Sequence, residues 1–105
     1  LKTLSTAGVR IAFGTDTGPA GRFQGYFEHI EIKMMSEAGL TPMQIIKAAT
    51  SDAARCWDKH KELGSIQPGN WADLIILSKN PLDDIENMRE IESVWIAGNR
   101  IPKTR

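Results

Sequence analysis

The sequence lacks several features that mark specialised classes of protein. Cys56 is its only cysteine, which excludes an internal disulfide and a cysteine-based zinc cluster within one chain, and which favours a reducing cytoplasmic location. Thirteen basic residues balance thirteen acidic ones, so no excess of positive charge points to nucleic acid or to an anionic membrane. No apolar run approaches the roughly 20 residues that cross a membrane.

The length of the chain sets a further limit. Its 105 residues suit one compact domain. They fall far short of the ~250 residues of a closed (β/α)₈ barrel. The first residue is Leu1 rather than methionine, and we expect the chain to begin inside a longer protein.

The N-terminal part of the chain has the pattern of one step in a parallel α/β fold. Residues 1–8 are typical of a helix end, with Gly8 as the glycine that stops it. Residues 9–13 are mostly apolar and include β-branched and aromatic side chains, which predicts a buried strand. Turn-forming residues at 14–19 then end this strand. A helix, a strand and a polar loop in this order are typical of parallel sheets.

Three helices are predicted in the middle of the chain. Apolar side chains recur at helical spacing over residues 26–38. Thr41 and Gln44 have the spacing of a capping box, so a second helix is expected to begin there. Ser51 or Asp52 is expected to cap a further short helix.

The second half of the chain predicts antiparallel strands. Turn signals recur at short intervals, and the stretches at 72–77 and 91–97 between them are rich in β-branched residues. Gly98 and Asn99 suit a tight hairpin after the second of these strands. Residues 82–88 are expected to form one helical turn.

The predicted strand at residues 9–13 has no parallel partner in this sequence. A lone strand leaves its amide and carbonyl groups unpaired, and a strand inside a parallel sheet needs a neighbour on each side. We therefore expect its partner strands to lie outside these 105 residues.

Asp16 is the first candidate for a chemical role. It comes just after the predicted strand, and sites in α/β folds form at the carboxyl ends of strands. A carboxylate there can bind a metal ion or accept a proton from water. The flanking residues Gly14, Thr15, Thr17 and Gly18 are common in turns, so local sequence alone favours an ordinary turn aspartate.

A series of short motifs runs along nearly the whole chain and changes that interpretation. The motifs are residues 14–16, His29 with Glu31, and residues 38–42, 48–50, 64–74 and 80–82, followed by Val94 and Gly98. Each motif is weak by itself, but their order and spacing are specific. The series is similar to the C-terminal third of the amidohydrolase superfamily, and most similar to its imidazolonepropionase-like and prolidase-like branch.

The resemblance implies a fold and a division into two parts. The superfamily has a (β/α)₈ or TIM barrel and a small β-sandwich built from both chain ends. Residues 1–60 would then be the end of the barrel, with its last strand and the helices after it. Residues 61–105 would be the C-terminal strands of the sandwich. The expected fold class is therefore α/β plus β, in a chain that is a fragment of a larger enzyme.

The resemblance also implies a chemistry for Asp16. In the superfamily, the aspartate that ends the eighth barrel strand ligates a catalytic metal, usually zinc, and acts as general base in the hydrolysis of carbon–nitrogen bonds. The expected substrate is a small cyclic amide or a dipeptide-like molecule. The superfamily's other ligands are a His-x-His pair, a lysine or glutamate, and two further histidines. None has a counterpart here, so the chain alone is expected to be inactive.

Three further residues are candidates for contact with substrate. The resemblance puts His29 close to the active-site loop, where it either anchors the loop or touches substrate. Arg22 and Phe23 lie in the loop after Asp16, where an arginine suits a substrate carboxylate and an aromatic ring suits a pocket wall. A flexible connector is an equal alternative for this glycine-rich loop.

Two alternatives come from other classes of protein. One is a non-catalytic domain that self-associates, as a homo-oligomer or by domain swapping, through its unpaired strand and apolar helix faces. The other, a small helical nucleic-acid module, is disfavoured by the neutral charge and the β-rich tail. We expect the following apolar side chains to be structural, in the core or between helices and strands: Met34, Met35, Met43, Cys56, Trp57, Trp71 and Trp95.

Overall fold

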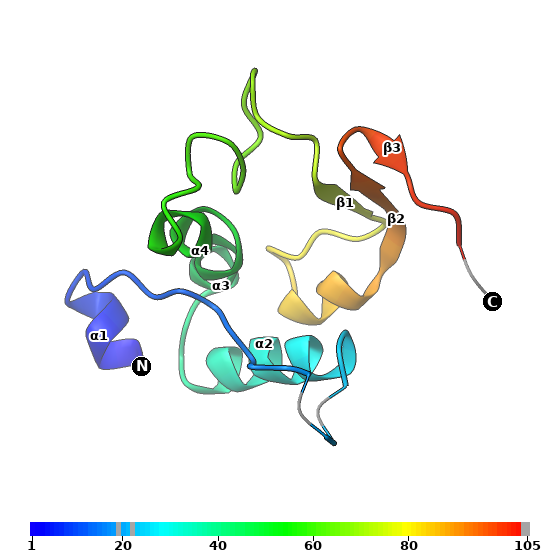
Figure 1. The fold of residues 1–105 in the computed structure, drawn as a ribbon. Coiled ribbons are helices and arrows are strands. Elements are labelled where there is room, and N and C mark those ends of the chain that lie inside the picture. The colour runs from blue at the N-terminus through cyan, green and yellow to red at the C-terminus, as the bar shows by residue number, and fades with distance from the viewer. Residues whose placement is uncertain (19, 22, 104–105) are drawn as a thin grey trace.

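Helices occupy the first half of the chain and a small sheet the second half. The computed structural model describes residues 1–18, 20–21 and 23–103, and Figure 1 shows the sheet beside the group of helices. The elements in chain order are α1 (Lys2–Thr6), α2 (Tyr26–Glu37), α3 (Pro42–Ala49), α4 (Ser51–Cys56), β1 (Leu74–Leu77), the 3₁₀ helix η1 (Ile85–Arg89), β2 (Ile91–Ile96) and β3 (Asn99–Arg100). None of the helices described is long and apolar enough to cross a membrane.

The longer helices form where spacing and capping predicted them. α2 ends one residue before the predicted end. α3 begins with the expected capping box, in which the Thr41 hydroxyl accepts a hydrogen bond from the Gln44 amide at 3.3 Å. The Gln44 side chain in turn accepts one from the Thr41 amide at 2.8 Å. These two bonds satisfy amides that the first turn of a helix otherwise leaves unpaired.

The predicted side-chain cap of α4 is wrong. The residue that caps α4 is Thr50, and its side chain makes no capping bond. The Thr50 hydroxyl instead donates to the Ile46 carbonyl in α3 at 2.7 Å. Because only Thr50 separates the two helices, its side chain completes the end of α3 rather than the start of α4.

The three strands form an antiparallel sheet in the order β1-β2-β3. Both predicted strands are confirmed with slightly shorter bounds, and Ile75 of β1 lies opposite Val94 of β2. The predicted hairpin is confirmed but its turn lies one residue earlier, because Asn99 already belongs to β3. The turn residues Ala97 and Gly98 both have positive φ angles, 51° and 78°, as a type I′ turn requires.

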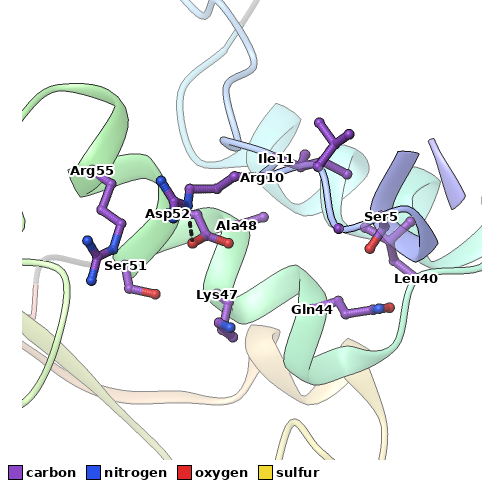
Figure 2. A pocket seen from close by; sticks show the side chains of 12 residues that line it. Ser5, Arg10, Ile11, Leu40, Gln44, Lys47, Ala48, Ser51, Asp52 and Arg55 are labelled. Carbon is purple, nitrogen blue, oxygen red and sulfur yellow. Dashed lines mark ion pairs between the residues drawn. The ribbon is translucent and has the colours of Figure 1, made fainter. Parts of the chain in front are cut away.

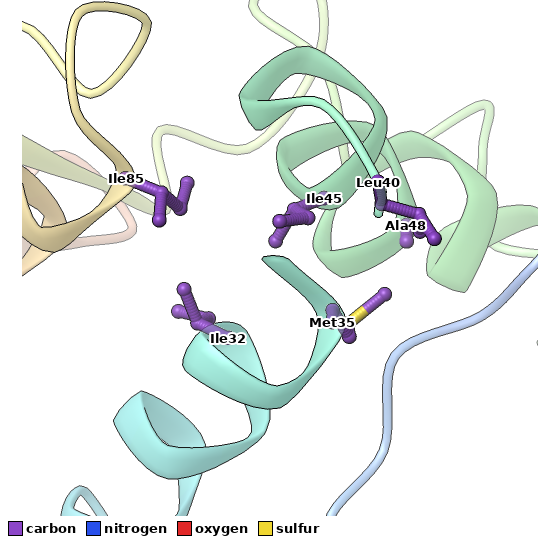
Figure 3. Packing of buried hydrophobic residues seen from close by; sticks show 6 residues of the cluster. All are labelled: Ile32, Met35, Leu40, Ile45, Ala48 and Ile85. Atoms are coloured by element: carbon purple, nitrogen blue, oxygen red, sulfur yellow. The ribbon is translucent and has the colours of Figure 1, made fainter. Parts of the chain in front are cut away.

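The hydrophobic core lies where α2, α3 and η1 meet. Figure 3 shows its buried members, which are Ile32, Met35, Leu40, Ile45, Ala48 and Ile85. Ile11 and Phe13 pack against this cluster from the segment that precedes Asp16. The candidate site is therefore attached to the same core as the helices.

Residues 9–13 form no strand, so that prediction is wrong for this structure. The segment runs as a coil past α3 towards α2 (Figure 1), and the Phe13 amide donates to the Ala48 carbonyl in α3 at 2.9 Å. A ladder requires a second strand alongside, and none lies there in the described part of the chain. The apolar pattern identified a segment that contacts the core, but an apolar pattern does not show whether a neighbouring strand is present to pair with it.

Most of the apolar side chains that we expected to be structural are exposed. Met35 is buried and Trp95 is half-buried. The prediction is wrong for Met34, Met43, Cys56, Trp57 and Trp71, which are all exposed. Trp57 is 79% exposed, and large apolar surfaces left open to water are characteristic of interaction sites. The described residues supply no second layer over these side chains.

Candidate functional site

Asp16 lies in the loop between the coil at residues 9–13 and helix α2. Its side chain is exposed, and its φ angle of 53° falls in the left-handed region. This conformation costs a residue other than glycine about 1–2 kcal/mol. Such a conformation persists only where neighbouring contacts hold it.

Glu28, in the first turn of α2, contacts both neighbours of Asp16. The hydroxyls of Thr15 and Thr17 each donate to the same oxygen, Glu28 Oε1, at 3.0 Å. The Gly25 amide donates to the other oxygen, Oε2, and so forms one half of a capping box. A single carboxylate therefore accepts hydrogen bonds from both neighbours of Asp16 and from the residue that precedes the helix.

Hydrogen bonding lowers the pKa of Glu28. The largest contribution comes from the backbone amide of Glu28 itself. Burial is the next largest effect and raises the pKa, and the Thr17 and Thr15 hydroxyls and the Gly25 amide each lower it further. The side chain is therefore ionised at neutral pH. An ionised carboxylate is a stronger acceptor than a neutral group, which favours all of these bonds.

Sequence reasoning missed Glu28, although a signal for it was present. A glutamate three residues after a helix cap is the acidic half of a capping box. Glycine at the cap position, Gly25, hid this pattern, because the usual motif has serine or threonine there. The two threonine bonds have no comparable signal, since they join residues 13 and 11 positions apart.

The other predicted site residues are not linked to Asp16 by contacts that the structure describes. His29 lies half-buried on α2, and its side chain makes no hydrogen bond or ion pair within the described residues. Phe23 is 69% exposed, and its carbonyl accepts a bond from the Phe27 amide at 3.2 Å. Arg22 lies outside the described residues.

The residues that the structure describes do not complete a metal site. Among them, no group of three or more histidine, cysteine, aspartate or glutamate side chains could hold a metal ion. A catalytic zinc centre takes about three protein ligands. Asp16 could supply one carboxylate oxygen, which by itself does not fit the requirement.

A polar hollow of about 590 Å³ lies at the other end of the coil that leads to Asp16 (Figure 2). Arg10 and Arg55 line it, and Arg10 Nε lies 3.6 Å from Asp52 Oδ1. Of the predicted site residues that the structure describes, none borders this hollow. Because sites in parallel α/β folds form after the carboxyl ends of strands, its position at the start of residues 9–13 suits a structural role better than a catalytic one.

Comparisons with known proteins agree with the resemblance in the motifs. A sequence model described as the amidohydrolase family matches residues 1–101. Ochratoxinase from Aspergillus niger is 39% identical over 97 residues, which cover 88% of this chain and 19% of the relative. Imidazolonepropionase from Treponema denticola is 29% identical over 106 aligned positions, which cover 95% of this chain and 25% of the relative.

The fold agrees as well. A solved Xaa-Pro dipeptidase, with methionine bound in its active site, superposes with a TM-score of 0.83 at 33% identity. The superposition covers 97% of this chain and 24% of the dipeptidase, so the chain spans about a quarter of that protein's length. The predicted family is confirmed: this chain belongs to the amidohydrolase family.

Proposed function

We propose that the chain is the C-terminal portion of a metal-dependent hydrolase that acts on carbon–nitrogen bonds in cyclic amides or dipeptide-like molecules. The observation that supports this most directly is the family match over residues 1–101, which includes Asp16. An imidazolonepropionase and a Xaa-Pro dipeptidase among the similar proteins agree with substrates of this size.

The proposed architecture divides the chain at residue 60. Residues 9–16 are the eighth barrel strand and its loop, α2 to α4 complete residues 1–60 of the barrel, and residues 61–105 belong to the β-sandwich. Two observations support this division. In the segment 9–13, Ile11 and Phe13 pack against the core, but no strand of the described residues lies beside it. The antiparallel sheet is formed entirely by residues after 73.

In the proposed reaction Asp16 is both a ligand to the catalytic metal, zinc in this proposal, and the general base. Its carboxylate accepts a proton from the water that attacks the substrate carbonyl, and later delivers it to the leaving nitrogen. His29, Phe23 and Arg22 contact the substrate. The described residues do not hold the metal by themselves.

Removal of the metal tests the proposal. In the full protein that carries this chain, we expect dialysis against a chelator to abolish hydrolysis of a Xaa-Pro dipeptide, and added zinc to restore it. Liquid chromatography measures the released amino acids, and mass spectrometry measures bound metal. A protein that keeps its full rate after its metal content falls well below one ion per chain would exclude metal-dependent hydrolysis.

Self-association of the isolated chain is a second candidate, favoured by its exposed apolar side chains. Trp57 is 79% exposed and Ile66 is 92% exposed. In light scattering, we expect the 105-residue chain to give species larger than its 11.6 kDa monomer. Trp57→Gln should reduce the size, and the neighbouring Lys59→Gln should not. A monomer with sharp tertiary signals would contradict association.

A further inference from the structure

Glu28 is the one described side chain that contacts both neighbours of Asp16. We propose that Glu28 is a positioning residue, which fixes the Asp16 carboxylate for reaction by holding Thr15 and Thr17 against helix α2. This inference rests on the proposed function of Asp16. Glu28 itself touches neither substrate nor metal in the proposal, and it acts through the backbone of the loop.

The geometry of the contacts restrains the loop on both sides of Asp16. Thr15 and Thr17 donate to one oxygen atom, each at 3.0 Å, so the two residues are held at a common point. Asp16 lies between them with its φ angle of 53°. Two attachments separated by a single residue restrain the backbone of that residue, and so they limit the directions that its side chain can take.

Glu28 Oε1, the oxygen that accepts from both threonines, belongs to a residue of helix α2, which packs in the core. Glu28, Ile32 and Met35 follow one another at spacings of four and three, and so lie on one face of α2. Ile32 and Met35 are buried in the core. The second oxygen of Glu28 accepts from the Gly25 amide, which fixes the rotation of the carboxylate. Movement of the loop would therefore require movement of a helix packed in the core.

The glycines of this loop add no side-chain contacts to it. Gly14, Gly18, Gly21 and Gly25 carry no side chains, and nothing would lie within 4 Å of a Cβ atom at any of them. Open space around these positions leaves the hydrogen bonds to Glu28 as the main described attachment between this loop and α2. A misplacement of about 1 Å can cost a catalytic group on the order of 10²-fold in rate, so this attachment matters for a general base.

The order of the loop can be measured without any reaction. In the full protein that carries this chain, NMR order parameters of the Thr15, Asp16 and Thr17 amides are expected near the rigid value of about 0.85. Glu28→Ala should lower them below about 0.6. Glu37→Ala removes an equal charge from the other end of α2, where Glu37 pairs with Lys33 at 4.0 Å, and should leave them unchanged.

Kinetics of the full protein then connect loop order to reaction. We expect Glu28→Ala to lower kcat by about 10- to 100-fold with little change in KM, because substrate contacts stay while the base is misaligned. Glu28→Gln should recover part of the loss, since its amide oxygen can accept from both threonines while its NH₂ group opposes the Gly25 amide. Should Glu28→Ala prove unstable, Thr15→Val with Thr17→Val removes the two threonine bonds and keeps Glu28 with its bond to the Gly25 amide.

The outcomes separate this inference from the proposed function. Order parameters at residues 15–17 that stay at the Glu37→Ala values, in both Glu28→Ala and the double valine variant, would overturn the positioning role. The positioning role would also be overturned if Glu28→Ala lowered kcat no more than Glu37→Ala does. If the loop loses order as expected but Asp16→Asn retains full turnover, the proposed function fails while the restraint by Glu28 stands.

Discussion

Asp16→Asn is expected to lower kcat of the full protein by about 10²–10⁴-fold, the range that a positioned general base contributes. Asparagine matches aspartate in shape and tolerates positive φ angles, so the loop backbone should keep its conformation. The change removes the proton acceptor and one negative ligand. Steady-state kinetics measure the loss of turnover, and mass spectrometry measures a reduced metal content.

Asp58 offers a matched control for this substitution. It is also an exposed aspartate with a left-handed backbone, at a φ angle of 55°. Asp58→Asn makes the same chemical change in the same conformation at a position outside the Asp16 loop, and it should leave turnover within twofold of the parent. Equal losses from both substitutions, or normal turnover in Asp16→Asn, would remove Asp16 from the reaction.

Local signals in the sequence predicted the local elements well. The capping box of α3 depends on residues three apart, and the hairpin depends on two adjacent turn residues. Both are decided within a few residues of chain, because the hydrogen bonds involved are short-range. The two local errors, the turn that lies one residue earlier than predicted and the missing side-chain cap of α4, also involve single residues. Asn99 belongs to a strand rather than to the turn, and Thr50 lies between two helices.

Burial was predicted poorly, because it depends on which layers cover each element. The apolar pattern of residues 9–13 predicted a buried strand, but only Ile11 and Phe13 are partly buried against the core and the other three residues are exposed. Pattern cannot show whether a neighbouring strand is present, and without one the segment makes no ladder. The same limit applies to Trp57 and Trp71, whose size predicts burial only where a second surface is available.

The role of Asp16 stays a prediction. It was drawn from the order of motifs along the chain, since the neighbours of Asp16 indicate no more than a turn. Glu28 was not found, because its role depends on a fold that brings Thr15 and Thr17 to the start of α2. Residues that position a catalytic group are generally recognised by such long-range contacts rather than by spacing in the sequence.

Gly64→Ala is expected to lower the free energy of unfolding by about 2–5 kcal/mol, the sum of two separate costs. Gly64 has a φ angle of 91°, which is strained for any residue with a Cβ atom. An added Cβ would also lie 2.5 Å from the Ala54 Cβ atom and 3.0 Å from the Thr50 carbonyl oxygen. Neither neighbour can rotate away, because one is a methyl group fixed to helix α4 and the other is backbone.

Gly69→Ala isolates the first of these costs. Gly69 has the same φ angle of 91°, but an added Cβ there would have no atom within 4 Å. It should therefore lose only the conformational part, about 1–2 kcal/mol. Urea unfolding followed by circular dichroism measures both variants. A larger loss for Gly64→Ala would show that this glycine lets residues 64–73 pass close to α4 on their way to the sheet. Equal losses would mean that the chain near Gly64 moves aside, and that the contact with α4 adds little to stability.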